Sequence, residues 1–430
     1  MVSIPHWPKV PLWRIPNKID LSVTLKLLEE LGNPHHKLPP TIHIAGTNGK
    51  GSTLATLNSI FTQGGYKVHS YTSPHLIEFN ERVKLANVAI SDDHLHDVLE
   101  RTRLAAEKAK INPSFFEGVS AAAFLAFAET PADLLLLETG LGGRLDCTNV
   151  IPNPALTILT SISIDHTEYL GNTLLDIAYE KAGIIKPNVP CVIGPQTSEV
   201  YQLLLKKCET VGAPAFCYEY DYAAEKTDYG FKYVSQKFNL ELPRPALKGD
   251  HQILNAAGAV AATMLLGTQF KLTKSIISQG LIATSWLGRL QLIPKEQTKQ
   301  LAGDNIEIYL DGAHNEAGAL CLSTWASENL KGPVYLILGM TRNRDATIFC
   351  NYFQHFVTKG ITVPVESEPS SYNARALAEE ASKSGIDFKD ADSLKCAIKE
   401  LTAYNQGKPA TIIVSGSLFL IADFLQLTAA

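Results

Sequence analysis

Short apolar runs alternate with longer amphipathic stretches along most of the chain. The apolar runs predict strands at residues 41–45, 67–72, 133–137, 155–161 and 189–193. The stretches between them repeat apolar positions at helical spacing and predict helices at 53–62, 92–110, 119–129, 173–182 and 198–211. Strands that alternate with helices are typical of βαβ units, so this part of the chain is expected to form a mainly parallel sheet.

The segment 216–247 interrupts this alternation. It is rich in tyrosine and phenylalanine, contains Gly230 and ends in Pro243 and Pro245, which predicts a small antiparallel excursion at the edge of the first domain. A helix is expected to follow at 250–266.

A second α/β pattern begins after residues 286–289. It predicts strands at 306–310, 334–338, 361–364 and 411–414, and helices at 317–330, 345–356, 374–384 and 393–404. We therefore place a domain boundary near Ser285, between an α/β domain over residues 1–285 and a second one over 286–430.

Composition and charge narrow the class of protein. With 430 residues, 45% hydrophobic and 19% charged, the chain has the balance of an ordinary globular protein of two or three domains. Its 38 basic and 43 acidic side chains give a net charge of −5, so no general basic field is present and nucleic-acid wrapping is not expected. Any anionic ligand must be held by local groups.

The remaining compositional features indicate a cytoplasmic protein. The seven cysteines are an odd number without C-x-x-C spacing, which disfavours a disulfide framework or a zinc site and fits a reducing compartment. Residues 1–18 have no apolar core and are not expected to be a signal peptide. The longest apolar run, 253–267, is shorter than a membrane span, so no membrane segment is expected.

The strongest local signal is the segment TIHIAGTNGKGST at residues 41–53. An apolar strand enters a glycine-rich turn and then a helix, an arrangement that surrounds phosphate oxygens with backbone N–H groups and a helix N-terminus. Lys50 adds a full positive charge, and the Ser52 hydroxyl can bind a phosphate-bridging magnesium ion. Gly51 separates these two residues, so the segment departs from the usual G-x-x-x-x-G-K-[ST] pattern. A glycine-rich turn with a surface lysine is the alternative.

Ionisable groups follow the ends of two further strands. Glu138 ends the apolar strand at 133–137, where a magnesium ligand is expected beside a phosphate loop, although a capping or solvated glutamate is the alternative. Asp165 and His166 follow the next strand, and on local grounds His166 is equally a packed or surface histidine. Lys181 lies in a predicted helix and, taken alone, is best interpreted as a solvated lysine.

Together these segments resemble the folylpolyglutamate synthase / dihydrofolate synthase family of the Mur ligase superfamily. The resemblance covers nearly the whole chain, through NKIDLSVTLKLLEELGNPHHKLP, IHIAGTNGKGST, YTSPHLIEFNERV, FFEGVSAAAF, ETGLGGRLDCTN, SIDHTEYLG, EKAGIIKP, GDHQILNAAGAV, GRLQ, DGAHN and VSGSLFL. GTNGKGS marks the superfamily, whereas TSPHL, ETGLGGRLD and DHTEYLG in this order mark the folate branch.

The resemblance implies a set of site residues. Two magnesium ions are expected, with the metal ligands Ser52, Ser73, Glu138, His166 and Lys181, the last of these as a carbamate. The residues expected to bind ATP are Asn48, Gly49, Lys50, Gly51, Ser52, Asn255, Arg289 and Asp311. Those expected at the pterin are Ile19, Asp20, Leu21, Ser22, Phe116, Glu117 and Gly118. Catalytic roles are expected for Lys50, Lys181 and His314.

The resemblance also implies a fold and a reaction. The fold is an N-terminal P-loop ATPase domain with a mainly parallel sheet, followed by a Rossmann-like glutamate ligase domain. ATP would convert an acceptor carboxylate into an acyl phosphate, which the amine of L-glutamate then attacks. Dihydropteroate, a folate, or both remain possible acceptors. The retained segments 19–22 and 116–118 favour both, as in the bifunctional bacterial members, and a monomer is expected. Leu287, Cys147 and the segment 339–345 depart from the family pattern, and the role of that segment stays open.

Two other functions compete with this interpretation. Another Mur-superfamily ligase is the nearer one, but the cell-wall members carry a uridine-nucleotide domain before the phosphate loop, and here the loop begins at Gly46. A nucleotide-dependent regulatory protein would explain the loop but not the group of Glu138, His166 and Lys181.

Overall fold

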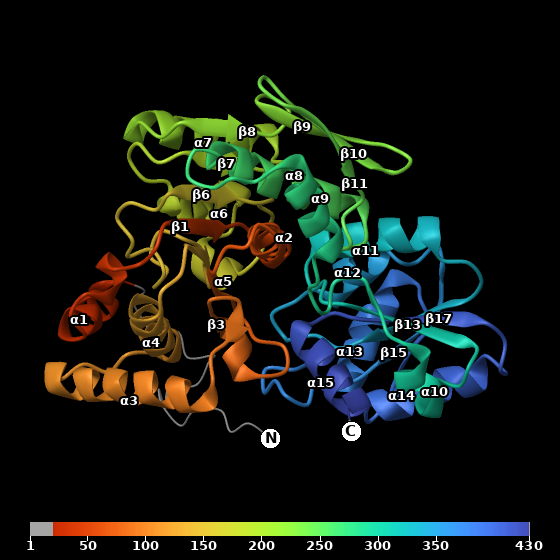
Figure 1. Cartoon of the computed structure of the whole chain (residues 1–430). Coiled ribbons are helices and arrows are strands. Elements are labelled where there is room, and N and C mark those ends of the chain that lie inside the picture. Colours follow the sequence, from red (N-terminus) through yellow and green to blue (C-terminus); the bar gives the residue numbers. More distant parts are fainter. Residues whose placement is uncertain (1–19, 430) are drawn as a thin grey trace. The chain divides into compact units, whose positions relative to one another are not determined.

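The computed structural model describes residues 20–429 of the chain. Ile19, one of the residues expected at the pterin, and the segment 1–18 lie outside the described residues. The chain forms two compact units (Figure 1). Unit 1 contains the described residues up to Ala246 together with Gln252–Ser285, and unit 2 contains Leu247–His251 and the described residues from Trp286 onward.

Unit 1 is built on an eight-stranded sheet in the order β4-β3-β2-β5-β1-β6-β7-β8. The strands are β1 (Thr41–Ala45), β2 (Val68–Tyr71), β3 (Val83–Leu85), β4 (Val88–Ala89), β5 (Leu134–Glu138), β6 (Leu156–Leu159), β7 (Cys191–Ile193) and β8 (Ala215–Cys217). The six neighbouring strands β2, β5, β1, β6, β7 and β8 are all parallel. Strand β3 pairs antiparallel with β2, and β4 pairs antiparallel with β3 at the edge. The predicted parallel sheet is therefore confirmed.

Helices occupy every segment of unit 1 where one was predicted. They are α1 (Ser22–Glu30), α2 (Lys50–Gln63), α3 (Asp92–Ala109), α4 (Phe115–Glu129), α5 (Thr167–Leu170), α6 (Leu174–Lys181), α7 (Ser198–Val211), α8 (Asp250–Leu265, whose first two residues belong to unit 2) and α9 (Lys274–Ala283). Of these, α1, α5 and α9 are additional helices that the pattern did not predict. Short 3₁₀ turns lie at Pro34–His36, Phe79–Arg82 and Ala182–Ile184. Two helices begin earlier than the apolar pattern predicts, α2 at Lys50 and α4 at Phe115. For α4 the cause is a capping box between Ser114 and Glu117.

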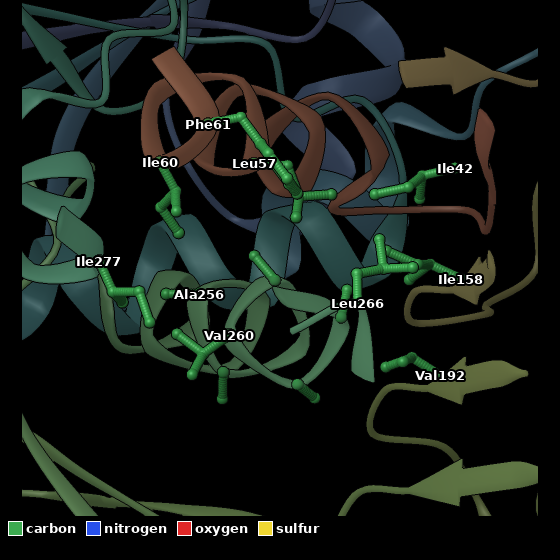
Figure 2. Close-up of a cluster of buried hydrophobic side chains, with 14 of the residues drawn as sticks. Ile42, Leu57, Ile60, Phe61, Ile158, Val192, Ala256, Val260, Leu266 and Ile277 are labelled. Carbon is green, nitrogen blue, oxygen red and sulfur yellow. The ribbon is translucent and has the colours of Figure 1, made fainter. Parts of the chain in front are cut away.

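Both faces of the parallel sheet are buried. Along β5, Leu134 and Leu136 belong to one apolar cluster and Leu135 and Leu137 to another. Figure 2 shows the first cluster, in which side chains of β1, β6 and β7 meet those of α2, α8 and α9. A strand that is buried on both faces reads as a continuous apolar run, which explains why these strands were recognisable in the sequence.

The segment after β8 forms a separate small sheet, as predicted. Strands β9 (Tyr222–Lys226), β10 (Gly230–Ser235) and β11 (Asn239–Pro243) pair antiparallel in the order β11-β10-β9. Pro243 is the last residue of β11, a position that a residue without an N–H group tolerates.

Unit 2 contains a six-stranded sheet in the order β12-β13-β17-β14-β15-β16. Its strands are β12 (Gln291–Leu292), β13 (Ile306–Asp311), β14 (Val334–Leu338), β15 (Val357–Thr362), β16 (Phe388–Asp390) and β17 (Ala410–Ser415). Its helices are α10 (Lys295–Ala302), α11 (Glu316–Asn329), α12 (Ala346–Asn351), α13 (Ala374–Ala381), α14 (Leu394–Tyr404) and α15 (Leu418–Ala429), with a 3₁₀ turn at Ser382–Ser384. All pairs except β12 with β13 are parallel.

Two predicted boundaries in unit 2 are wrong. The helix expected at 345–356 ends at Asn351, and the strand expected at 361–364 begins at Val357 instead. The first part of this strand was not predicted because Lys359, a buried charged residue, interrupts the apolar run. Its ammonium group lies 3.1 Å from Asp387 and 4.9 Å from the centre of the Tyr404 ring.

None of the helices within residues 20–429 is long and apolar enough to cross a membrane. The seven cysteines are all free thiols.

Candidate active site

The turn between β1 and α2 is fixed from the neighbouring strand. The N–H groups of Thr47 and Asn48 donate to the Ser161 carbonyl oxygen at 2.8 and 3.2 Å. The Thr47 hydroxyl donates to the Ser163 carbonyl oxygen at 3.0 Å, and the Asn48 amide donates to the Ser163 hydroxyl at 3.3 Å. Helix α2 starts directly after this turn, so its first N–H groups have no partners within the helix. A turn that is held in place in this way and leads into the N–H groups at the start of a helix is suited to an anion.

Two glycines of the turn cannot be replaced without a clash. Gly49 caps α2 with a φ of 90°, and a methyl group on it would lie 2.4 Å from Asn255 Oδ1. A methyl group on Gly46 would lie 1.8 Å from Thr160 Oγ1. The structure therefore places Asn255, which comes from α8, against the turn.

Lys50 and Glu138 face each other beside the turn. Lys50 Nζ lies 3.9 Å from Glu138 Oε1 and donates to the Thr47 carbonyl oxygen at 3.3 Å. Glu138 ends β5, its side chain is only 6% exposed, and its Oε2 accepts from the Ser73 N–H at 3.3 Å. Strand β5 lies between β1 and β2, which is why residues 50, 73 and 138 meet at the carboxyl ends of these strands.

Lys181 is a buried residue and not the solvated lysine that its local sequence suggests. It is 4% exposed, and its Nζ donates to the Gly46 carbonyl oxygen at 2.9 Å. Burial lowers the pKa of Lys181 to about 7, and the positive charge of Lys50 acts in the same direction, while Asp165 and Asp146 oppose it. Near neutral pH a large fraction of this amine is uncharged and nucleophilic.

Asp165 and His166 follow β6 at the same edge of the sheet. Asp165 is buried and accepts from the His166 N–H at 2.7 Å. His166 has a φ of 50° and caps the short helix α5, and its side chain is 39% exposed with Nε2 3.8 Å from Asp165 Oδ1. The histidine ring is thus partly open to solvent beside a buried carboxylate.

The chemistry of these side chains suits a hard divalent cation. Ser52 in the first turn of α2, Ser73 and Glu138 offer oxygen atoms, which Mg²⁺ prefers. Within residues 20–429 no three His, Cys, Asp or Glu side chains form a metal-binding group by themselves. Only Glu138 and His166 of the predicted ligands are of these types, so the expected sites also depend on hydroxyl groups, on a modified lysine and on the phosphates of the nucleotide.

The segments expected at the pterin differ in what their side chains do. The Phe116 ring lies against Gly140, where an added methyl group would be 2.2 Å from Phe116 Cζ. The Glu117 carboxylate accepts from the Ser114 N–H at 2.7 Å, so it stabilises the start of α4. Asp20 accepts from the Ser22 N–H at 2.9 Å just before α1. Leu21 caps α1, and Gly118 lies buried in α4.

Sequence reasoning missed two buried charged residues in this region. Asp146 accepts from the Gly140 and Leu141 N–H groups at 2.9 and 2.8 Å. These two hydrogen bonds hold the backbone of the segment that follows Glu138. Arg82 is 2% exposed, donates to His75 Nδ1 at 2.8 Å and lies over the Phe79 and Phe115 rings. For Asp146 the available signal was a carboxylate directly after a glycine-rich segment, whereas Arg82 stands among other polar residues and gave no such signal.

In unit 2 the predicted nucleotide residues gather at the end of β13. The Asp311 carboxylate accepts from the Leu290 N–H and the Ala313 N–H, both at 2.8 Å. Arg289 lies against Gly312, where an added methyl group would be 2.6 Å from the Arg289 guanidinium. His314 Nδ1 lies 2.8 Å from the Gly312 carbonyl oxygen. In the divergent segment 339–345, Asp345 caps α12 by accepting from the Ile348 N–H.

Known proteins match this chain over most of its length. The sequence pattern of the Mur ligase middle domain matches residues 44–263, and that of the dihydrofolate synthetase C-terminal domain matches residues 294–427. The dihydrofolate synthase/folylpolyglutamate synthase of Bacillus subtilis is 37% identical over 414 residues, which cover 93% of this chain and 92% of that protein. The folylpolyglutamate synthase of Lacticaseibacillus casei is 31% identical, covering 94% and 92%.

Solved structures give the same result. E. coli FolC in complex with DHPP and ADP aligns with a TM-score of 0.85 and 28% identity, covering 96% of this chain and 94% of that one. Mycobacterium tuberculosis folylpolyglutamate synthase complexed with ADP aligns with a TM-score of 0.86 and 27% identity, covering 97% and 96%. The matching sequence patterns, the relatives and these alignments together show that the chain belongs to the folylpolyglutamate synthase / dihydrofolate synthase family of Mur ligases.

Proposed function

We propose that this chain is an ATP-dependent ligase that joins L-glutamate to dihydropteroate, to the γ-carboxylate of a folate, or to both. The observation that carries the proposal is the convergence of Lys50, Glu138 and the buried Lys181 on the turn between β1 and α2. The E. coli relative with DHPP and ADP supports a nucleotide and a folate-type acceptor as the substrates.

The reaction needs activation before the amide can form. A carboxylate is a poor electrophile, so transfer of the γ-phosphoryl group of ATP first makes an acyl phosphate on the acceptor and releases ADP. The amine of glutamate then attacks the acyl carbon and expels phosphate. The protein contributes positioning and neutralisation of charge and does not form a covalent intermediate itself.

The nucleotide is proposed to bind at the turn that precedes α2. The N–H groups of residues 49–52 and the Lys50 ammonium would hold the β- and γ-phosphates. Asn255 would contact the nucleotide from α8, since it already lies against Gly49. Arg289, Asp311 and His314 of unit 2 are proposed to contact the nucleotide and its phosphates as well.

Two Mg²⁺ ions fit the oxygen-rich donors around Glu138. Ser52, Ser73 and Glu138 would hold one ion, and Glu138, His166 and carbamylated Lys181 the other. When bound, magnesium offsets the negative charge of the phosphates and of the acceptor carboxylate.

The environment of Lys181 supports its proposed carbamylation. Its uncharged amine can add to the carbon of CO₂ and lose one proton, which gives a carbamate with one negative charge. A lysine whose pKa is lowered to about 7 is able to do this near neutral pH, whereas an exposed lysine is almost fully protonated. The product offers carboxylate-type oxygen atoms at a position where a cation would repel a metal ion.

One assay with separate acceptors tests the proposed function. ATP, Mg²⁺ and glutamate are offered with dihydropteroate or with a tetrahydrofolate, and the products are identified by mass. Phosphate release that requires both an acceptor and glutamate, together with a product one glutamyl unit heavier, is expected. ATP hydrolysis that is unaffected by acceptor and glutamate would instead indicate a nucleotide-dependent regulatory protein.

A further inference from the structure

A buried polar network connects the middle of β1 with the segment that follows β5. His43 in β1 has no exposed surface, and its Nε2 lies 2.8 Å from the Thr148 hydroxyl. That hydroxyl donates to Asp146 Oδ1 at 2.5 Å. Asp146 in turn accepts from the N–H groups of Gly140 and Leu141, the second and third residues after Glu138.

The positions of the hydrogen atoms in this network follow from counting donors. Asp146 accepts from the N–H groups of Gly140, Leu141 and Thr148 and from the Thr148 hydroxyl, which is the pattern of a carboxylate. Thr148 has one hydroxyl hydrogen, and Asp146 receives it. His43 Nε2 must therefore carry a hydrogen and donate to the Thr148 oxygen.

The other ring nitrogen of His43 agrees with this assignment. Nδ1 is buried and has no hydrogen-bond partner, and an N–H group there would be left without an acceptor. Burial, assisted by the charge of Lys186, lowers the pKa of His43 to about 3, so the ring is neutral. A neutral ring with its hydrogen on Nε2 is the form in which His43 can donate to Thr148.

The network ends where the proposed acceptor site begins. His43 pairs with Leu137 in the sheet, next to Glu138. Gly140, whose N–H group Asp146 holds, lies against the Phe116 ring. The turn between β1 and α2, in contrast, is held by hydrogen bonds to Ser161 and Ser163 after β6.

We propose that His43 is a positioning residue that fixes the acceptor side of the active site through Thr148 and Asp146. It donates from Nε2, directs the Thr148 hydroxyl to Asp146, and thereby sets the backbone of residues 140–141 against Phe116. The kinetic part of this inference rests on the proposed ligase function, whereas the hydrogen assignment does not.

The hydrogen assignment is tested by NMR of the intact wild-type protein labelled with ¹⁵N-histidine. The His43 signal, identified by its loss in a His43→Gln variant, should show a protonated Nε2 and an unprotonated Nδ1 at neutral pH. A protonated Nδ1, or a doubly protonated ring, would overturn the proposal. This measurement needs no substrate, so it remains decisive even if the proposed ligase function fails.

The positioning role is tested with a matched pair of variants. Glutamine can place an N–H donor at the position of Nε2, whereas asparagine places it at the position of Nδ1. His43→Asn should raise the KM for the acceptor about tenfold, equivalent to about 1.4 kcal/mol, with the KM for ATP changed by less than about twofold. His43→Gln should retain most of the acceptor affinity. Equal changes in both KM values, or identical behaviour of the two variants, would show a merely structural role.

Variants of Thr148 test the same series of hydrogen bonds, from His43 through Thr148 to Asp146, independently. Thr148→Ser keeps the hydroxyl and should resemble the wild-type protein, while Thr148→Val should reproduce the kinetic change of His43→Asn. The double variant His43→Asn/Thr148→Val should be no worse than either single variant, because each change breaks the same network. Additive losses would contradict the proposal. His96→Asn, at an exposed histidine of α3, is the control.

Discussion

The ammonium group of Lys181 donates to the carbonyl oxygen of Gly46 across 2.9 Å. The donor is the last residue of α6, and the acceptor is the first residue after β1, at the beginning of the turn that leads into α2. The contact holds an amine whose pKa is lowered to about 7 in a buried position next to Lys50. The hydrogen bond places Lys181 beside the turn, although Lys181 and Gly46 lie 135 positions apart in the chain.

Lys181→Met should therefore remove the proposed carbamate and with it most of the activity. We expect kcat to fall by about 100-fold or more, the range seen when a group that stabilises charge in the transition state is lost. Wild-type protein freed of CO₂ should lose activity and regain it with bicarbonate, whereas the variant should not respond. Lys186→Met, at a partly buried lysine after α6, is the control. A wild-type protein indifferent to bicarbonate would contradict carbamylation.

Lys50→Ala and Glu138→Ala should each abolish turnover with little loss of fold. Lys50 carries the side-chain positive charge on the turn, and Glu138 is the carboxylate that faces it at 3.9 Å. Each loss should exceed about 100-fold in kcat/KM, while circular dichroism stays unchanged. Lys26→Ala, at an exposed position of α1, is the control. Near-normal activity of either purified variant would contradict the site.

Gly49→Ala should damage nucleotide binding specifically. Gly49 and Gly65 both have positive φ values, 90° and 82°, but only Gly49 lies against another side chain, that of Asn255. Each alanine should lower the free energy of unfolding by about 1 kcal/mol because of its backbone conformation. Only Gly49→Ala should also raise the Kd for ATP, by about tenfold or more. This is measured by calorimetric titration, and an equal effect of both variants on ATP would refute the explanation.

Asp311→Asn should weaken the hydrogen bonds that position Arg289 and His314, the residues of unit 2 proposed to contact the nucleotide. The Asp311 carboxylate accepts from two N–H groups, and an asparagine amide would turn an NH₂ group toward one of them. The loss of one such bond to a charged acceptor costs about 1–3 kcal/mol of unfolding free energy. Activity should fall as well, because Arg289 and His314 lie next to these N–H groups in the chain. Asp304→Asn, an exposed aspartate, should leave stability and activity unaffected, and equal effects of both changes would contradict the prediction.

The neutral His43 makes folding stability depend on pH. Its folded pKa of about 3 lies below the ordinary value of about 6.5, so the unfolded chain binds the proton more readily. Its contribution to stability is therefore fully present above about pH 6.5 and decreases as the pH falls toward 3. Between about pH 7.5 and 5.5 the wild-type protein should lose about 1 kcal/mol more than His43→Gln, measured by urea unfolding. Parallel pH profiles would disprove the assignment.

Much of the fold was predictable because its strands are buried on both faces. Continuous apolar runs marked β1, β5 and β14 to within one residue. Helix α2 was predicted to start late, because its first turn contains Gly51 and lacks the apolar spacing that reveals a helix. Helix α15, with LFLIADFL at its start, is apolar on nearly all sides, so its sequence carries no helical period either.

The positions of candidate site residues were predictable where the residues lie at the ends of strands or within a recognisable motif. Lys50, Glu138 and Asp165 follow this rule. The roles of Asp146 and Thr148 were not predictable, because their partner His43 lies inside an apolar strand more than a hundred positions away. Such a pairing is set by the order of strands in the sheet, and a local pattern of residue types does not contain that order.

The position of β1 between β5 and β6 has a consequence for how a newly made chain acquires activity. The turn proposed to bind the phosphates is synthesised early, but Ser163, which accepts a hydrogen bond from Thr47, follows Thr47 by 116 residues. A growing chain that has not yet reached Ser163 has the glycines and Lys50 without the support that shapes them. Nucleotide binding should thus appear only after β6 has joined the sheet, so ATP would stabilise the finished unit and cannot guide its early assembly.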